Sequence, residues 1–138
     1  MALDKRIREV VFNKYNGYCA YCGDKLIKMQ IDHIIPQSNF NWCIKNKRDI
    51  PEFLNHLNEN DVNHIDNLNP SCSICNKAKD TFSLRVFRQE LEDQLKRAKK
   101  YSRNYRFALK YGQVKETPNP IIFYFEKNSL FPIKKTIN

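Results

Sequence analysis

Hydrophobic and polar residues alternate with two different periods in the first third of the chain. Over residues 3–15, apolar side chains recur every three or four positions with lysines and arginines between them, which predicts an amphipathic helix. Asn16 and Gly17 are expected to end this helix. Over residues 26–35 the period shortens to two, which predicts a strand that ends just before Pro36.

The rest of the chain contains a polar stretch, two helical patterns and a second apolar run. Residues 37–66 are polar and loop-like, with a short helix expected around residues 51–58. A helix is expected to begin at Asn76, and apolar positions at helical spacing predict one long helix over residues 84–108. The apolar run 121–125 is expected to form a short strand. This pattern predicts an α+β fold, and 138 residues suffice for one domain with a modest core.

Four of the five cysteines form two Cys-x-x-Cys pairs, about fifty residues apart. They are Cys19, Cys22, Cys72 and Cys75. Each pair turns tightly enough to present both sulfurs to one ion, and four thiolates complete the tetrahedron that structural zinc prefers. Two disulfides, or four unrelated buried thiols, are the alternatives. The fifth cysteine, Cys43, is expected to be a small buried residue.

The start of the chain carries charges but no apolar segment typical of a secretory signal. No apolar run is long enough to span a membrane. We therefore expect a cytoplasmic protein that does not bind membranes. Thiols stay reduced in that compartment, which favours zinc over disulfides.

The chain is strongly basic, with a formal net charge of +9 and a pI of ≈ 9.4. This charge favours a polyanionic partner, most simply nucleic acid, and a basic but inert surface is the alternative. Between Gln94 and Lys115 the chain carries eight basic residues and no acid. Those expected to contact phosphates are Lys96, Arg97, Lys99, Lys100, Arg103, Arg106 and Lys110. A merely solvated helix face is the other interpretation, and the interleaved Tyr101, Tyr105 and Tyr111 either stack on bases or pack within the protein.

Asp32 and His33 stand at the end of the first predicted strand. Adjacent strand residues point to opposite faces, so the two side chains share one site only if the strand bends there. A neutral histidine can accept a proton near pH 7. Carboxylate and amide oxygens suit magnesium or manganese better than zinc. The plainer alternatives are a structural histidine and a surface carboxylate.

Four short motifs follow one another in a suggestive order. They are residues 18–23 (YCAYCG), 31–36 (IDHIIP), 66–68 (DNL) and 72–79 (CSICNKAK). Together they resemble the HNH endonuclease family, a branch of the ββα-metal nucleases. The resemblance covers about residues 5–80, and the chain beyond about residue 85 lies outside it.

The resemblance implies a role for each matching residue. His33 matches the general base, and Asp32 matches the metal-binding acid beside it. Asn67 matches the asparagine that braces the loop and orients the histidine. Asn76 matches the last signature position, which binds the catalytic Mg²⁺ or Mn²⁺, so the chain resembles an H-N-N variant. The four cysteines match the structural zinc site found in many members.

Several of these residues have a second interpretation. Asn67 also suits an Asx turn, and Asn76 also suits a helix cap. Lys79 is either a phosphate contact or a solvated helix residue. His64 lies near Asn67 in sequence and is a lesser candidate for a second base or phosphate ligand, with a surface or packing role as the alternative.

The sequence thus predicts a small ββα-metal core with a four-cysteine zinc knuckle over residues 1–82. A basic helical extension with a short strand, residues 83–138, is expected to pack on it as one compact domain. The implied function is hydrolysis of phosphodiester bonds by a metal-dependent endonuclease, with double-stranded DNA as the favoured partner and a homodimer or partner protein also compatible. The alternatives are a zinc-stabilised nucleic-acid-binding module without catalysis and a nuclease subunit that depends on a partner.

Overall fold

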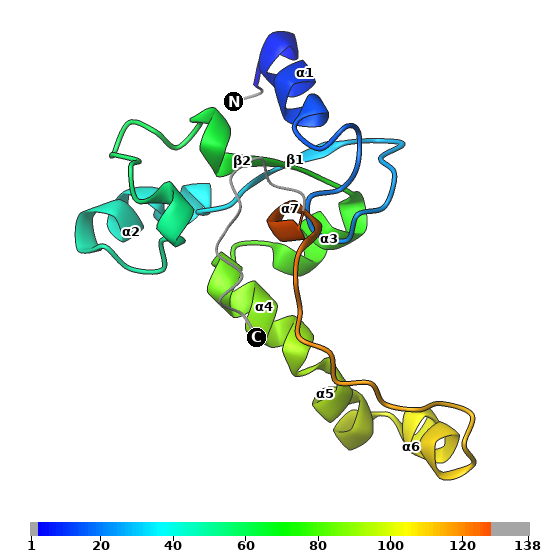
Figure 1. Ribbon diagram of the computed structural model, residues 1–138. Coiled ribbons are helices and arrows are strands. Elements are labelled where there is room, and N and C mark those ends of the chain that lie inside the picture. Colours follow the sequence, from blue (N-terminus) through cyan, green and yellow to red (C-terminus); the bar gives the residue numbers. More distant parts are fainter. Residues whose placement is uncertain (1–2, 128–138) are drawn as a thin grey trace.

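The computed structural model describes residues 3–127 and shows an α+β arrangement of seven α-helices and a two-stranded antiparallel sheet (Figure 1). In chain order the elements are α1 (Lys5–Asn13), β1 (Gln30–His33), α2 (Phe40–Asn46), β2 (Leu68–Ser71), α3 (Ser73–Lys79), α4 (Leu84–Glu92), α5 (Gln94–Tyr101), α6 (Arg103–Lys110) and α7 (Tyr124–Lys127). Within residues 3–127, no helix has both the length and the apolar character needed to cross a membrane.

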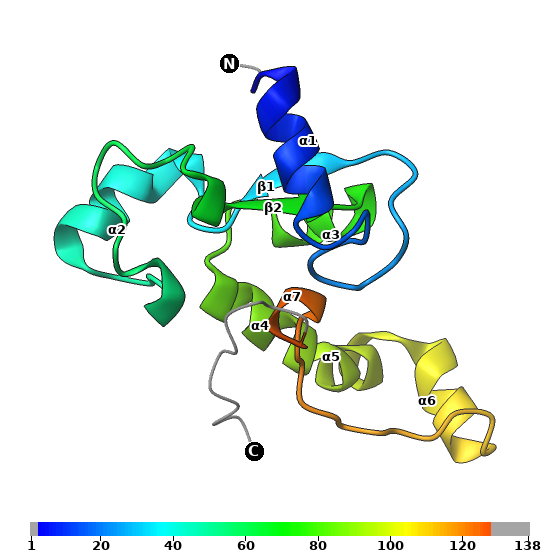
Figure 2. The same cartoon turned by 45° about the horizontal axis from the view of Figure 1, so that its top comes forward.

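The sheet brings the end of β1 next to α3. In the antiparallel register Asp32 lies opposite Asn69, and His33 lies opposite Leu68. Only Cys72 separates β2 from α3, and the helix folds back against β1 (Figure 2). Residues from two distant parts of the chain therefore meet at one edge of this small unit.

The predicted first helix is confirmed as α1, and the Asp4 carboxylate caps it by accepting a hydrogen bond from the amide of Ile7 at 2.9 Å. The predicted first strand is too long, because β1 covers only Gln30–His33. The amide of Leu26 instead donates to the carbonyl of Gly17 at 2.8 Å, so the preceding residues form a turn against the cysteine loop.

The core joins the cysteine loop to the C-terminal half of the chain through aromatic rings. Tyr21 packs edge-on against Phe87, Phe123 and Phe125, with ring centroids 5.6, 5.3 and 6.0 Å away. All four side chains are at most 4 % exposed. Arg88 of α4 adds a bidentate ion pair to Glu126 of α7, at 2.8 and 2.6 Å. The expected extension therefore shares its core with the first 82 residues.

The single long helix predicted over residues 84–108 is wrong, because the structure divides it into α4, α5 and α6. The first break is at Asp93, and the second is at Ser102, whose backbone is extended (φ −108°, ψ 108°). The Ser102 hydroxyl accepts the amide of Tyr105 at 3.1 Å, so it acts as the N-cap of α6. The helical spacing of apolar residues continues through such a cap, so this spacing does not reveal the break. We call α5 and α6 the arm, because they extend away from the sheet (Figure 1, Figure 2).

Two other expected boundaries differ from the structure. The expected strand 121–125 is absent, because its last residues start α7, although the amides of Tyr124 and Phe125 donate to the carbonyls of Tyr21 and Ala20. The helix expected from Asn76 begins at Ser73, since the Cys72 sulfur accepts the amide of Cys75 and caps it.

The polar segment 37–66 contains more structure than expected. It includes α2 and three short 3-10 turns, one of them Glu52–Leu54 in place of the helix expected around residues 51–58. Cys43 is 3 % exposed, which confirms the expected buried role. Its neighbour Trp42 is 55 % exposed.

Candidate metal centre and active site

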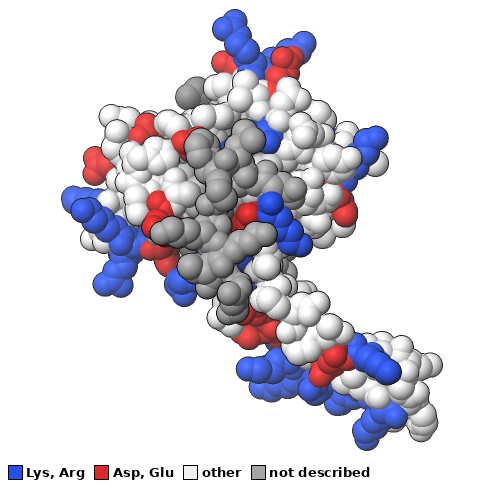
Figure 3. All heavy atoms as spheres, viewed as in Figure 1, with Lys and Arg blue, Asp and Glu red and all other residues white. Residues whose placement is uncertain are grey.

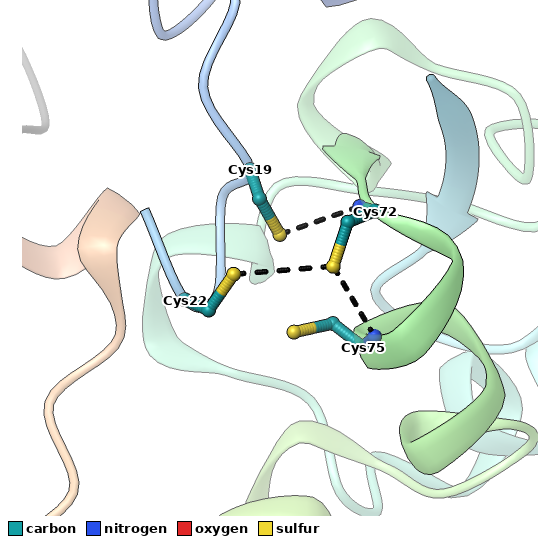
Figure 4. Close-up of side chains that lie close together, drawn as sticks. All are labelled: Cys19, Cys22, Cys72 and Cys75. Carbon is teal, nitrogen blue, oxygen red and sulfur yellow. Dashed lines mark hydrogen bonds between the residues drawn. The ribbon is translucent and has the colours of Figure 1, made fainter. Parts of the chain in front are cut away.

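The four paired cysteines converge on one point. Cys19 and Cys22 come from the loop after α1, and Cys72 and Cys75 come from the start of α3 (Figure 4). Their sulfur atoms lie within 4.8 Å of one another. The Cys22 and Cys72 sulfurs are 3.9 Å apart. A tetrahedral zinc ion with Zn–S bonds of about 2.3 Å separates its sulfurs by about 3.8 Å, whereas a disulfide would bring them to about 2 Å. The cluster can therefore hold a metal ion such as zinc.

Backbone amides point at these sulfurs. The amide of Cys72 donates to the Cys19 sulfur, the amide of Cys75 to the Cys72 sulfur, and the amide of Asp24 to the Cys22 sulfur, each at 3.4 Å. Gly23 permits the tight turn with φ +80°, and a Cβ there would lie 2.6 Å from the Tyr124 ring. The loop is therefore shaped to present thiolates to one centre.

The acidities of the cysteines fit a site that needs a cation. A hydrogen bond from Cys75 and three backbone amides lower the pKa of Cys19 to about 4. Burial and the nearby Cys19 charge raise the pKa of Cys22 to about 12, against the amide of Asp24 that lowers it. Donation to Cys19 and burial raise the pKa of Cys75 well above its usual value. The Cys19 thiolate therefore forms readily, whereas Cys22 and Cys75 require a bound positive charge to ionise.

Asp32 points into the protein interior. Its side chain is 4 % exposed, its Oδ1 lies 3.2 Å from the Lys79 ammonium, and its Oδ2 accepts the Tyr21 hydroxyl. Burial raises the pKa of the Asp32 carboxyl and lowers the pKa of the Lys79 ammonium, while the opposite charge of each partner opposes these shifts. The metal-binding acid expected from the sequence is thus already engaged on both oxygens.

The expected contact between Lys79 and nucleic acid is wrong for this structure, because Lys79 is fully buried. Its ammonium also donates to the backbone carbonyl of His33 at 3.0 Å. Lys79 therefore joins α3 to the end of β1, and it holds the backbone on which the candidate base stands.

His33 follows Asp32 at the end of β1 and is partly exposed, whereas Asp32 is buried. Its Nε2 lies 2.8 Å from the Oδ1 of Asn63. An amide oxygen only accepts hydrogen bonds, so Nε2 carries a proton, and in the neutral ring Nδ1 carries the lone pair. The ring is therefore oriented with one nitrogen available as a base.

Asn67 is fully buried and braces the segment after His33. Its Oδ1 accepts the amide of Ile35 at 2.8 Å, and its Nδ2 donates to the carbonyls of Ile35 and Val62 at 3.2 and 2.9 Å. Its own carbonyl accepts the amide of Ile34 at 2.8 Å. These bonds hold the bend at Ile34 and Ile35, directly after β1, whereas Asp32 and His33 themselves remain in the strand.

Asn76 lies in the middle of α3 rather than at a cap. Its Nδ2 donates to the Oε1 of Gln30 at 2.6 Å, so its carbonyl oxygen is the atom available to a cation. Asp32, His33 and Asn76 line the same open hollow of ≈ 570 Å³. The structure thus brings three of the four predicted catalytic residues to one surface, with Asn67 behind them.

Sequence reasoning missed four contributors to this region: Tyr21, Gln30, Asn63 and Asp80. Asp80 follows α3 with a positive φ of 47° and adds a second carboxylate to the hollow. These residues lie in different segments, and no spacing rule relates them. His64 is not among the residues that line the hollow, and it lies instead beside His56 and Asp66.

The predicted basic stripe from Lys96 to Lys110 lies on the arm. Figure 3 shows basic side chains gathered along the arm, away from the sheet. Some of them have internal partners: Arg97 pairs with Glu90 at 3.4 Å, and Lys99 pairs with Glu116 at 3.0 Å. Arg106 donates to the carbonyls of Lys99 and Lys100 at the end of α5.

The other predicted phosphate contacts on the arm are exposed. Within residues 3–127, Lys96, Lys100, Arg103 and Lys110 form no ion pair. Aromatic rings stand beside them: Tyr101 and Tyr111 are 73 % and 78 % exposed, and the Arg103 guanidinium lies 5.2 Å from the Phe107 ring centre. The arm therefore combines exposed positive charge with exposed rings.

These observations define a small α+β protein with a four-cysteine site that can hold a metal ion such as zinc, beside a polar hollow. No family model, no curated protein and no solved structure matches the chain. Its chemistry therefore has to be inferred from the residues of the site.

Proposed function

We propose that this protein is a metal-dependent endonuclease of the HNH type that hydrolyses phosphodiester bonds, with double-stranded DNA as its favoured substrate. The observation that carries the proposal is the shared hollow of Asp32, His33 and Asn76, next to the four-cysteine site and the β1–β2–α3 unit. A module that only binds nucleic acid has no need for a histidine oriented through one ring nitrogen.

In the proposed reaction, His33 Nδ1 accepts the proton of a water molecule that attacks the phosphorus atom. The P–O bond to the leaving oxygen breaks as the new P–O bond forms, and the leaving oxygen takes up a proton from solvent water. Asn63 holds the Nε2 proton and fixes the ring. Positioned proton transfer of this kind contributes roughly 10²- to 10⁴-fold to rate.

A divalent ion such as Mg²⁺ or Mn²⁺ would be held by Asp32 and Asn76, and when bound it supplies positive charge to the phosphate and the leaving oxygen. The donor set fits, because an acidic oxygen and an amide oxygen are hard ligands. Binding at Asp32 must compete with Lys79, whose ammonium keeps a second acceptor in the carbonyl of His33. Asp80 adds a further carboxylate to the same hollow.

The arm supplies the proposed substrate contact. Exposed lysines and arginines neutralise phosphates irrespective of sequence, and exposed tyrosines can stack on unpaired bases. In this proposal the arm binds the nucleic acid, and the residues that line the hollow catalyse its hydrolysis.

The test is cleavage of supercoiled plasmid by the zinc-loaded full chain with Mg²⁺ or Mn²⁺. We expect nicked or linear product from the wild type, and a loss of about 10²-fold or more in His33→Ala. Glu59→Gln, an exposed substitution in the segment 37–66, is the control and should cleave like the wild type.

The second candidate is a zinc-stabilised binding module, and the engagement of Asp32 by Tyr21 and Lys79 favours it. Binding of the plasmid by both the wild type and His33→Ala, with cleavage by neither, would support this second function. Equal cleavage by both would remove His33 from the proposed mechanism.

A further inference from the structure

Three side chains outside the candidate active site meet in a second cluster. His56 follows the 3-10 turn Glu52–Leu54, and His64 and Asp66 lie eight and ten residues further along. The Nε2 of His56 is 2.8 Å from the Oδ2 of Asp66, and the Nδ1 of His64 is 3.7 Å from the same oxygen. The two imidazole rings stand edge to face, with centres 5.6 Å apart.

We propose that His56, His64 and Asp66 form a second metal site, which takes a divalent transition-metal ion such as Zn²⁺. One potential ligand atom from each residue lies within 4.8 Å of the others. An ion bound tetrahedrally at about 2.0–2.1 Å separates its nitrogen and oxygen ligands by about 3.3 Å. The observed 2.8 and 3.7 Å lie on either side of that value, so small side-chain rotations complete the geometry.

The chemistry of the donors selects the type of ion. Two imidazoles and one carboxylate suit Zn²⁺, Ni²⁺, Cu²⁺ or Fe²⁺, and they are a poor set for Mg²⁺ or Ca²⁺. The site also has an entry path, because the side chains of His56 and Asp66 are 52 % and 47 % exposed. Three protein ligands and an open side leave the remaining position to water.

Metal binding would require His64 to give up one hydrogen bond. The Nδ1 of His64 accepts the amide of Asp66 at 3.0 Å, so it is unprotonated and its lone pair is turned toward this end of the cluster. Binding exchanges that hydrogen bond for a metal–nitrogen bond. A nearby cation, Lys14, donates its ammonium protons to the carbonyls of Ile65 and Leu68, at 3.0 and 2.6 Å, on the backbone beside the cluster.

A metal ion bound at this site would close a loop of the chain that contains Asn63. An ion that joins His56 to His64 and Asp66 ties together the two ends of the segment that carries Asn63. Asn63 in turn accepts the Nε2 proton of His33. The second metal would therefore restrain the group that orients the candidate base, and this part of the inference rests on the proposed function.

The experiment counts metal, so it does not depend on nuclease activity. The full chain, zinc-loaded at its cysteines, is dialysed against dilute Zn²⁺ in excess Mg²⁺, and zinc per chain is measured by elemental analysis. We expect His56→Asn/His64→Asn to hold one equivalent less than the wild type. Because the chain contains three histidines, His33→Asn is the matched control and should retain the wild-type count.

Nuclear magnetic resonance of the imidazole rings locates the ion. Added Zn²⁺ should shift the ring nitrogens of His56 and His64 in the wild type, and amide spectra of the double variant should show an intact fold. Equal zinc in the wild type and the double variant would show that His56 and Asp66 form only an ion pair, and would overturn the site. Loss of the extra zinc in His33→Asn alone would place it in the hollow and overturn the site equally.

Discussion

At the level of single residues, the contacts of Lys79 give it a different role from the one that its position in the motif suggests. In the sequence Lys79 is a basic residue near a cysteine pair, and this position suggests a contact with phosphate. The structure buries it completely between Asp32 and the carbonyl of His33. A buried charge pair adds little net stability, but removal of one member leaves the other charge without compensation.

We therefore predict that Lys79→Met lowers the free energy of unfolding by about 3 kcal/mol near neutral pH. Burial already raises the pKa of Asp32 in the folded state, and loss of Lys79 raises it further. The folded variant then binds a proton more tightly than the unfolded chain, so its stability falls as pH rises through that raised pKa. Urea unfolding should show a larger deficit near neutral pH than at about pH 4, the ordinary pKa of an aspartate.

The control is Lys77→Met, an exposed lysine on the same helix, which should leave stability nearly unchanged. Lys79→Met should bind nucleic acid as tightly as the wild type when folded. A stable Lys79→Met protein with weakened binding would instead show that the lysine reaches phosphates.

At the scale of elements, the arm separates positive charge from the rest of the molecule. Its two helices are capped and braced internally: Ser102 caps α6, and Glu116 accepts both the Tyr105 hydroxyl and the Lys99 ammonium at 3.0 Å. Side chains that take part in this bracing are less available to phosphates than those that do not. The electrostatic contribution to binding should therefore come from a subset of the stripe.

We predict that Lys96→Gln/Lys100→Gln/Arg103→Gln weakens binding of any nucleic-acid sequence. The slope of log K against log salt concentration should become shallower by about 2–3. Fluorescence anisotropy with labelled duplex over a range of salt concentrations measures that slope. The three residues lie on the solvent side of the arm, so circular dichroism should show unchanged helix content.

Lys45→Gln/Lys47→Gln/Arg48→Gln removes the same charge from the exposed end of α2 and serves as the control. A control whose slope changes as much as that of the arm variant would show that net charge, rather than the arm, governs binding.

At the scale of the whole molecule, the four-cysteine cluster joins parts of the chain that are distant in sequence. It fastens the loop after α1 to the start of α3, and Tyr21 between its first two cysteines anchors the aromatic core. Loss of a metal ion from this point would loosen both the sheet and the packing of α4 and α7. Structural zinc binding is commonly worth about 10–16 kcal/mol, which exceeds the stability of a small domain.

We accordingly predict that a strong chelator abolishes cooperative thermal unfolding near neutral pH. The cause is mutual repulsion of thiolates, or burial of thiols, once the compensating ion is removed. Differential scanning calorimetry should show the transition return when Zn²⁺ is added back and remain absent with Mg²⁺ alone. An unchanged transition in the chelated protein would show that the aromatic core suffices without metal.

Local sequence patterns were enough to predict the features that depend on local chemistry: α1 from its period, the mixture of helix and strand, and the four-cysteine cluster from its paired spacing. It also placed Asp32, His33, Asn67 and Asn76 together as candidates through ordered motifs, and the structure brings them into one region.

The groups that these residues contact depend on the tertiary fold. The burial of Lys79, the Tyr21 and Lys79 contacts of Asp32, and the Asn63 bond to His33 all join segments between 11 and 47 residues apart. The second histidine cluster likewise depends on how residues 52–66 turn. Local periodicity carries no information about such long-range contacts, because they are set by the competition among all segments to bury apolar surface and satisfy polar groups. The breaks at Asp93 and Ser102 leave the hydrophobic period of the segment unchanged, so periodicity alone does not reveal them.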